Sequence, residues 1–258
     1  MKYYVVDVFT AERFKGNPAG ICVLDSWLET SLMQNIAFEN GLAETAFLVG
    51  ANGKYGLKWF TPEQEMDLCG HATLGSAYAV LNYLEPKLRS VEFDSNSGKL
   101  FVEREGDEYL MDLPSRMPVR IEIPPVLPRA LGVNVLETWQ SRDMLALVES
   151  EEDVRNLNVN LNLLKELGEL NNFIVTARGS DCDFVSRFFT PGATIPEDPV
   201  TGSAHCSLIP YWSKILRKTD MTAKQLSKRG GSLRCRDCGD RVRIGGHARI
   251  YLIGEIFV

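Results

Sequence analysis

The chain has 258 residues, of which 45% are hydrophobic and 24% are charged. These fractions are typical of a folded globular protein and exclude a disordered, collagen-like or coiled-coil chain. At this length, one large domain and two domains of about 120 residues are both open. The six cysteines do not have the spacing of a disulfide framework. No uncharged stretch that could form a helix reaches the roughly 18 residues that a membrane span needs. We expect a cytoplasmic protein without a secretory leader.

The formal net charge of −6 argues against general affinity for nucleic acid. One interval, 214–249, departs from this balance because it carries eleven Lys or Arg against three Asp. In Leu233–Arg236 and Arg241–Ile244 the basic residues alternate with apolar ones, which is typical of the solvated face of a two-stranded ribbon. We expect neither a nucleic-acid nor a membrane partner.

The first half alternates short β-branched runs with helical periodicity. In chain order it predicts strands at 3–9 and 21–24 around the turn Gly16–Gly20, a helix ending at Gly41, strands at 45–49 and 57–60, and a helix at 71–84. The last of these helices is apolar on nearly every side, so we expect it to be buried.

An internal repeat links the two halves. Phe60-Thr61-Pro62 recurs as Phe189-Thr190-Pro191, 129 residues later, and Gly75-Ser76-Ala77 recurs as Gly202-Ser203-Ala204, 127 residues later. A helical pattern at 151–167 and a strand at 173–177 precede the second copy, as a helix and a strand precede the first. A period of this size indicates a duplicated domain and not a solenoid. The proline-rich stretch 114–128 predicts halves at 1–115 and 116–258, and the last strand can return to the first half.

Each half brings a loop of small residues to the start of its buried helix, Asp67–Thr73 in one and Glu197–His205 in the other. The N–H groups at a helix N-terminus lack intrahelical acceptors, and the macrodipole adds partial positive charge there. A duplicated domain commonly works between its halves, so two such ends meeting at one site would receive a small carboxylate. The same field would hold His71 and His205 toward their neutral forms.

Glu44 is the third candidate, because it places a carboxylate at the entry of the apolar run Thr45–Val49. Desolvation at that position would make Glu44 a stronger base, suited to general acid–base catalysis. A capping or salt-bridged residue at the end of a strand would show the same pattern, so the residues alone leave both interpretations open.

The ordered set of motifs resembles the PhzF-like family of phenazine biosynthesis, a part of the diaminopimelate epimerase-like superfamily. The resemblance covers nearly the whole chain and rests on these motifs: Val6-Asp7-Val8-Phe9-Thr10, Gly16-Asn17-Pro18-Ala19-Gly20, Glu44-Thr45-Ala46-Phe47, Phe60-Thr61-Pro62, Cys69-Gly70-His71-Ala72-Thr73 and Asp198-Pro199-Val200-Thr201-Gly202-Ser203-Ala204-His205. It implies an α+β fold of two duplicated halves, each a mixed β-sheet or barrel wrapped round a central helix.

The resemblance also implies a function. In this family, a residue at the position of Glu44 removes a proton from one carbon and returns it to another, so the chain is expected to be a cofactor-independent isomerase of a small carboxylated metabolite. His71, Asp198 and Ser203 match the positions that hold the substrate and assist the transfer. We place the remaining substrate contacts at Asn17, Gly70, Ala72, Thr73, Thr201 and Gly202. We expect no cofactor and no metal, and a homodimer is plausible.

Two other functions stay open. Related epimerases use one cysteine from each half, and Cys69 occupies the first such place, but Asp198 lies at the matching distance of nine residues after its phenylalanine. The second alternative is a non-catalytic ligand-binding or protein-interaction module. Cys235 and Cys238 have the spacing of half a zinc site, without a second pair of ligands, and no nucleotide-binding glycine motif occurs.

Overall fold

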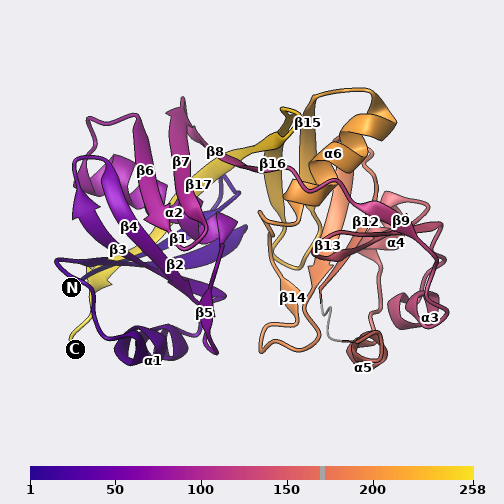
Figure 1. Ribbon diagram of the computed structural model, residues 1–258, viewed down its shortest axis with the longest axis horizontal. Coiled ribbons are helices and arrows are strands. Elements are labelled where there is room, and N and C mark those ends of the chain that lie inside the picture. The colour runs from indigo at the N-terminus through magenta and orange to yellow at the C-terminus, as the bar shows by residue number, and fades with distance from the viewer. Residues whose placement is uncertain (169–171) are drawn as a thin grey trace. The chain divides into compact units, whose positions relative to one another are not determined.

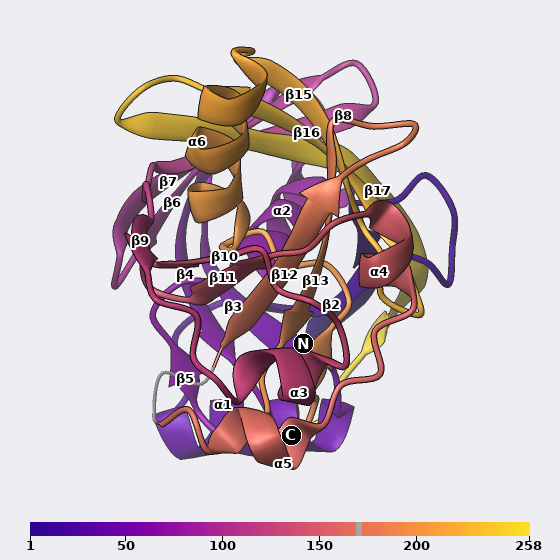
Figure 2. The same cartoon turned by 90° about the vertical axis from the view of Figure 1, so that its right-hand side faces the viewer.

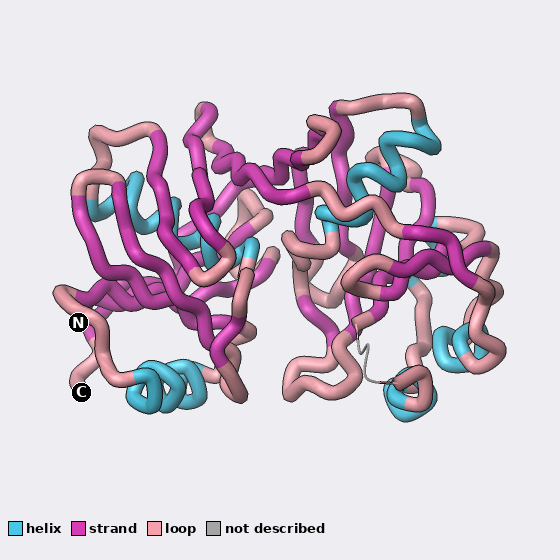
Figure 3. Tube along the Cα trace, viewed as in Figure 1, coloured by secondary structure: helices cyan, strands magenta, loops and turns pink. Residues whose placement is uncertain are grey.

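The computed structural model describes residues 1–168 and 172–258. It divides into two compact units, the first made of Met1–Leu113 with Arg243–Val258 and the second of Pro114–Val242. The second unit thus ends at Val242, and the last segment of the chain returns to the first unit, which the sequence allowed for the last strand. Strands outweigh helices in both units (Figure 3).

In the first unit, eight strands close into a ring (Figure 1). Neighbouring strands pair in the order β17, β1, β2, β3, β4, β6, β7, β8 and back to β17, with parallel pairs only at β2–β3 and β4–β6. Their bounds are Arg241–Glu255 for β17, Lys2–Val8, Asn17–Leu24, Glu44–Ala51 and Lys54–Phe60 for β1 to β4, and Ser90–Ser95, Gly98–Glu105 and Glu108–Pro114 for β6 to β8. The short β5 (Glu65–Met66) pairs with the end of β4.

The helix α2 (Gly70–Ala79) lies against the inner face of this ring, and all ten of its residues are buried. A π-helical turn, η1 (Val80–Leu84), continues it. Gly75 permits the close packing, because a Cβ at this position would lie 3.2–3.3 Å from side-chain atoms of Ile21, Val8 and Ala19. The burial expected from the apolar sequence at 71–84 is confirmed for α2.

The helix α1 (Thr30–Asn40) covers the other face of β3 and β4 with Met33, Ile36 and Ala37. Gly41 ends it in the left-handed conformation, and its N–H donates to the carbonyls of Ala37 and Phe38. A glycine just after the last turn is the preferred residue for this geometry, because it has no Cβ to clash. The helix end expected at Gly41 is confirmed.

The second unit repeats most of these pairings. Its strands are β9 (Val119–Ile121), β10 (Glu137–Gln140), β11 (Met144–Leu147), β12 (Phe173–Arg178), β13 (Phe184–Phe189), β14 (Glu197–Asp198), β15 (Asp220–Gln225) and β16 (Gly231–Asp237). Six strand pairs of the second unit match six pairs of the first unit, in the same order and with the same parallel or antiparallel direction. They are β10–β11, β11–β12, β12–β13, β13–β14, β13–β15 and β15–β16, which correspond in turn to β1–β2, β2–β3, β3–β4, β4–β5, β4–β6 and β6–β7. This shared order of pairings confirms the duplicated α+β architecture.

The helix α6 (His205–Leu216) takes the place of α2 and packs against β15 and β16 (Figure 2). Two short helices, α4 (Glu151–Arg155) and α5 (Leu161–Lys165), stand where the sequence indicated one helix over 151–167, and α3 (Leu127–Leu131) contacts α5. Asn156 ends α4 and Asn160 caps α5 with its side chain, so two capping asparagines divide the expected helix. No helix in the described part of the chain is long and apolar enough to cross a bilayer.

One of the two repeated triplets is structurally equivalent and the other is not. Phe60 and Phe189 end β4 and β13, and Thr61 and Thr190 each donate their N–H to the residue before β5 or β14. Gly75-Ser76-Ala77, in contrast, lies inside α2, whereas Gly202-Ser203-Ala204 precedes the first residue of α6. The segment between the Phe-Thr-Pro triplet and the helix is longer in the second unit than in the first. The two glycines therefore lie at similar distances from their triplets in sequence but at different places in the fold.

Candidate active site

Strand order brings three candidate residues to one end of the ring in the first unit. Asn17 and Glu44 are the first residues of the parallel strands β2 and β3, and Ala19 lies opposite Glu44 in their register. The helix α2 begins at Gly70, so His71 lies in its first turn. Parallel strands begin at the same edge of a sheet, which places the carboxylate and the amide beside each other.

The turn before Asn17 depends on Gly16. Its φ is +65°, and a Cβ built on it would lie only 2.1 Å from the carbonyl oxygen of Val8. A residue with a side chain would therefore clash with backbone that cannot move aside, apart from the strain of the left-handed conformation. Gly16 in this way lets the chain turn sharply between β1 and the buried amide of Asn17.

His71 stands between the side chains of Glu44 and Asn17. Its Nε2 lies 3.2 Å from Oε2 of Glu44, and its Nδ1 lies 3.1 Å from Nδ2 of Asn17. The side chain of His71 is 4% exposed and that of Glu44 is 17% exposed, while Asn17 is fully buried. Of the three, only the carboxylate keeps appreciable access to the surroundings, and the imidazole lies behind it.

Cys69 completes this cluster from the residue that precedes α2. Its Sγ lies 3.6 Å from Nδ1 of His71, and the residue is 4% exposed. The thiol therefore approaches the ring from the same side as Asn17, and the carboxylate of Glu44 approaches the other nitrogen.

Glu44, Cys69 and His71 also have the donor atoms of a metal site, all within 4.8 Å of one another. The geometry suits a metal poorly, because an ion bound through Nε2 of His71 would lie toward Glu44 and an ion bound through Nδ1 would lie toward Cys69 and the NH₂ group of Asn17. An amide donor repels a cation. The arrangement fits a cluster of polar side chains in mutual contact better than a three-ligand site.

The candidates of the second unit gather in the loop between β14 and α6. The hydroxyl of Thr201 donates to Oδ2 of Asp198, and the N–H of Thr201 donates to Oε1 of Gln225 at 2.8 Å. Nε2 of Gln225 donates in turn to the backbone carbonyl of Asp198 at 2.7 Å. Gly202 is buried and Ser203 is half-buried, both in the turn before α6. The loop is thus held by hydrogen bonds on both sides of Asp198.

The strand register corrects the comparison of Asp198 with Cys69. Asp198 pairs with Phe188, and Met66 pairs with Trp59, the corresponding residue of the first unit. Asp198 therefore corresponds to Met66 and lies in β14, whereas Cys69 directly precedes α2. The equal distance of nine residues from each phenylalanine is misleading, because the loop before β14 is longer than the loop before β5.

His205 has different surroundings from His71. It is fully buried, its Nδ1 donates to the carbonyl oxygen of Thr201 at 2.8 Å, and its ring packs beside Phe184. Burial lowers the pKa of His205 to about 4, and the bond to Thr201 opposes this only in part. The neutral form expected from a helix field thus has a different cause, the loss of solvent around the ring.

Several residues predicted to contact substrate are buried in the first turn of α2, where they contact other residues of the protein. Thr73 is fully buried and its hydroxyl donates to the carbonyl oxygen of Cys69 at 2.6 Å, which closes the first turn of α2. Gly70 and Ala72 are buried in the same turn. Their backbone N–H groups, at the start of the helix, are the part of this segment suited to a carboxylate.

Two residues that support the second loop were missed in the sequence. Gln225 is 1% exposed at the end of β15, on the same face as Met221 and Ala223, so a polar residue at a buried strand position was the available signal. Arg187 forms two hydrogen bonds to the carboxylate of Glu197, at 2.7 and 2.9 Å, and so fixes β14 beside Asp198. Nothing in the spacing of Arg187 indicated this partner.

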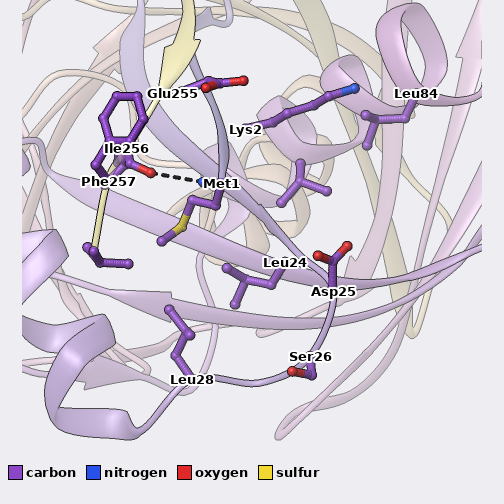
Figure 4. Close-up of a pocket in the computed structure, with 12 residues that line it drawn as sticks. Met1, Lys2, Leu24, Asp25, Ser26, Leu28, Leu84, Glu255, Ile256 and Phe257 are labelled. Carbon is purple, nitrogen blue, oxygen red and sulfur yellow. Dashed lines mark hydrogen bonds between the residues drawn. The ribbon is translucent and has the colours of Figure 1, made fainter.

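A separate pocket of about 700 Å³ lies at the other end of β1 and β2 (Figure 4). Its lining comes from both chain ends and includes Met1, Lys2, Leu24, Asp25 and Glu255. The amino group of Met1 donates to the carbonyl of Ile256 beside it. Asn17 and Leu24 are the two ends of β2, so this pocket is remote from the Glu44 cluster along the strand.

The comparisons with known proteins place the chain in a family. The family model described as phenazine biosynthesis-like protein matches residues 6–254. An uncharacterized isomerase of Pseudomonas aeruginosa is 44% identical, over 98% of this chain and 97% of its own length. A crystal structure of a PhzF-family protein of Enterococcus faecalis has a TM-score of 0.96 and 46% identity, with 100% of this chain and 99% of that chain covered.

A more distant structure supports the fold alone. A probable proline racemase from Agrobacterium radiobacter has a TM-score of 0.67 at 10% identity, covering 100% of this chain and 93% of that chain. With the match across nearly the whole length, the chain belongs to the phenazine biosynthesis-like, or PhzF, family of isomerases.

Proposed function

We propose that the protein isomerises a small carboxylated metabolite by moving a proton from one carbon to another through Glu44, without a cofactor. The observation that carries this proposal is the carboxylate of Glu44, 17% exposed, with Nε2 of His71 at 3.2 Å. A general base for a carbon acid needs partial desolvation, and it needs a fixed orientation toward the carbon. The buried imidazole supplies the second of these.

In the proposed reaction, Glu44 accepts a proton from an acidic carbon of the substrate, and the electron pair of the broken C–H bond spreads into the conjugated system. The protonated carboxyl group then gives the proton to another carbon, where the new C–H bond forms. Reactants and products differ only in the positions of one hydrogen and the double bonds. His71 stays beside Glu44 throughout and needs to transfer no proton itself.

The remaining candidates would bind the substrate. The N–H groups of Gly70, His71 and Ala72, at the start of α2, suit the carboxylate of the substrate. We propose that Asp198, Thr201, Gly202 and Ser203 also bind the substrate, as the family resemblance implies, and that the bonds of Gln225 support the shape of their loop.

Removal of the carboxylate tests this function. Proton NMR in D₂O measures deuterium incorporation into candidate carboxylates, beginning with a dihydro-hydroxyanthranilate of the phenazine type. Once the wild-type protein labels a compound, Glu44→Gln should lower the labelling rate by about 10²–10⁴-fold. Glu39→Gln, with the same loss of charge on the exposed side of α1, is the matched control. Unchanged labelling by a folded Glu44→Gln variant would remove Glu44 from the reaction.

A cysteine-dependent epimerase is the second candidate, because Cys69 lies 3.6 Å from His71. Such an enzyme needs a second acid–base group opposite the thiol, and the residue that precedes α6, in the place of Cys69, is Ala204. Loss of labelling in Cys69→Ser would favour this candidate, and retained labelling would discard it. Labelling that survives a chelator would likewise support a reaction without metal.

A cytoplasmic location and a homodimer belong to the same proposal. All six cysteines lie in the described part of the chain and are free thiols, which suits a reducing compartment. Exposed apolar side chains of Tyr251, Leu252 and Ile253 near the end of β17 offer a surface for a second copy. Sedimentation of the purified protein would establish its oligomeric state.

A further inference from the structure

Each ring nitrogen of His71 lies close to a side-chain group whose role as donor or acceptor is fixed. On the Nδ1 side, Nδ2 of Asn17 can only donate, because an amide NH₂ group has no acceptor lone pair. On the Nε2 side, an ionised Glu44 can only accept. A neutral imidazole satisfies both partners in a single tautomer, the one with its proton on Nε2.

We infer that Asn17 is a positioning residue that fixes His71 as the neutral Nε2–H tautomer, and so keeps an N–H group and not a lone pair beside the carboxylate of Glu44. Asn17 is fully buried, which suits a residue that acts through His71 better than one that touches substrate. Gly16, whose backbone passes close to Val8, allows the turn that leads to it. The inference deepens the proposed function and rests on it for its role in catalysis.

This arrangement would keep the transferred proton on Glu44. For His71 to take that proton, both of its nitrogens would carry hydrogen, and the Nδ1–H would then face the NH₂ group of Asn17. Two donors facing each other in a buried site are unfavourable, because neither finds an acceptor. The proton taken from the substrate therefore stays on the carboxyl group, from which it can return to another carbon.

The thiol of Cys69 is compatible with the same tautomer. Its Sγ lies 3.6 Å from Nδ1, where an S–H group can donate weakly to an unprotonated nitrogen. Both groups on this side of the ring thus act as donors, and the carboxylate on the other side acts as the acceptor.

His205 provides an internal reference with the opposite tautomer. Its Nδ1 lies 2.8 Å from the carbonyl oxygen of Thr201, which can only accept, so the neutral ring carries its proton on Nδ1. The chain has only three histidines, so the imidazole nitrogens of His71 and His205 can be assigned separately.

The test is nitrogen-15 NMR of the imidazole rings in the full-length protein at neutral pH, without any substrate. Nitrogens with and without hydrogen resonate far apart, so each tautomer is read directly. In the wild-type protein, His71 should show a protonated Nε2 and an unprotonated Nδ1, and His205 should show the reverse. A protonated Nδ1 in His71 would overturn the inference.

Two variants separate the influence of Asn17 from that of Glu44. In Glu44→Gln the tautomer of His71 should persist, because Asn17 still donates to Nδ1; a change to the Nδ1–H form would show that Glu44 sets it. Asn17→Asp replaces the NH₂ donor by an oxygen, so the Nδ1 signal of His71 should move to the protonated type. An unchanged signal in the folded variant would overturn the inference.

Asn156→Asp, the same substitution at an exposed residue of the second unit, should leave the His71 signals in place. If Asn17→Asp does not fold, the spectra of the wild-type protein and Glu44→Gln still decide the question. Because none of these spectra requires turnover, a failure of the proposed isomerase function would leave the result on the tautomer standing, and the reverse also holds.

Discussion

The two units share an order of strand pairings but differ at the residue just before the first paired residue of β3–β4 in one unit and of β12–β13 in the other. In the first unit Thr45 pairs with Phe60, so Glu44 precedes that pair, and in the second Phe173 pairs with Phe189, so Asn172 precedes it. Glu44 contacts the imidazole of His71, whereas Nδ2 of Asn172 donates to Oδ1 of the buried Asp143 at 3.0 Å. The same backbone position thus carries a carboxylate in contact with a histidine in one unit and an amide that donates a hydrogen bond in the other.

The histidines at the two helix starts differ in the same way. His71 is 3% exposed and contacts the carboxylate of Glu44, whose side chain is 17% exposed, while His205 is fully buried against Phe184 and the carbonyl of Thr201. The two units therefore share strands and helices, but the side-chain contacts of their histidines differ. The side chains at one end of each unit give the two histidines different neighbours and different exposure.

The largest effect is expected at the position where the units differ. Glu44→Gln should lower the rate of deuterium labelling by about 10²–10⁴-fold, because positioned general acid–base groups contribute about that much. Asn172→Ala should instead lower the free energy of unfolding by about 1–3 kcal/mol, because Asp143 loses a hydrogen bond inside the protein. Urea unfolding and the labelling rate of both variants measure the two effects. Loss of labelling in a fully stable Asn172→Ala would break the comparison.

The buried His205 should make stability depend on pH. Its pKa is about 4 in the folded protein against 6.5 for the free side chain, so the unfolded state binds more protons between these values. Stability from this group is complete above about pH 6.5 and is lost as the pH falls toward 4, up to about 3 kcal/mol.

Urea unfolding across this pH range measures the effect. His205→Gln should flatten the pH dependence, and His247→Gln, at a partly exposed histidine outside both sites, is the control. An equally steep pH dependence after loss of His205 would assign it to other groups.

The ion pair between Arg187 and Glu197 should affect both stability and the loop of Asp198. Arg187 is about one-eighth exposed and also lies within 3.5 Å of the carbonyls of Val154, Arg155 and Leu157. Arg187→Ala should cost about 1–3 kcal/mol of unfolding free energy, because hydrogen bonds to charged groups are lost. A double-mutant cycle with Glu197→Gln isolates the pair. Additive effects of the two substitutions would show that Arg187 acts through other contacts.

A smaller effect is expected at the cap of α4. Ser150 accepts a hydrogen bond from the N–H of Asp153, and the carboxylate of Asp153 accepts one from the N–H of Ser150. Ser150→Ala should lower the free energy of unfolding by about 1 kcal/mol. Thr30→Ala at the start of α1, where no side-chain cap is formed by Glu29, is the matched control in the first unit. Equal losses in both variants would mean that the capping box adds nothing to α4.

Much of this architecture could be predicted from local pattern. Alternating and β-branched runs located β1, β3, β4 and β12, and the repeated Phe-Thr-Pro triplet located the same turn in both units. The turn expected at Gly16–Gly20 was too long, because β2 already begins at Asn17 and pairs with β1 from there. The expectation of one helix over 151–167 was wrong, because Asn156 and Asn160 stop and restart it. Periodicity detects an apolar face that continues across such a break, but it does not detect the break itself.

The sequence predicted which residues belong to the candidate site, but it did not predict most of the contacts between them. Glu44 and His71 were singled out on residue type and family motifs, and they lie 3.2 Å apart. The contact of Asn17 with His71 was not foreseen, and neither were the supports that Gln225 and Arg187 give to the second loop. These contacts join residues far apart in the chain, whose distance depends on strand register.

By itself, the sequence determined the duplicated α+β class, the two buried helices and the family, because hydrophobic period, turn residues and ordered motifs are local properties of a chain. Only the tertiary structure decided that Asp198 corresponds to Met66 and not to Cys69, and that His71 meets Glu44 while His205 is enclosed. Loop lengths differ between the units, so counting residues loses the correspondence that hydrogen-bonded strand pairs preserve.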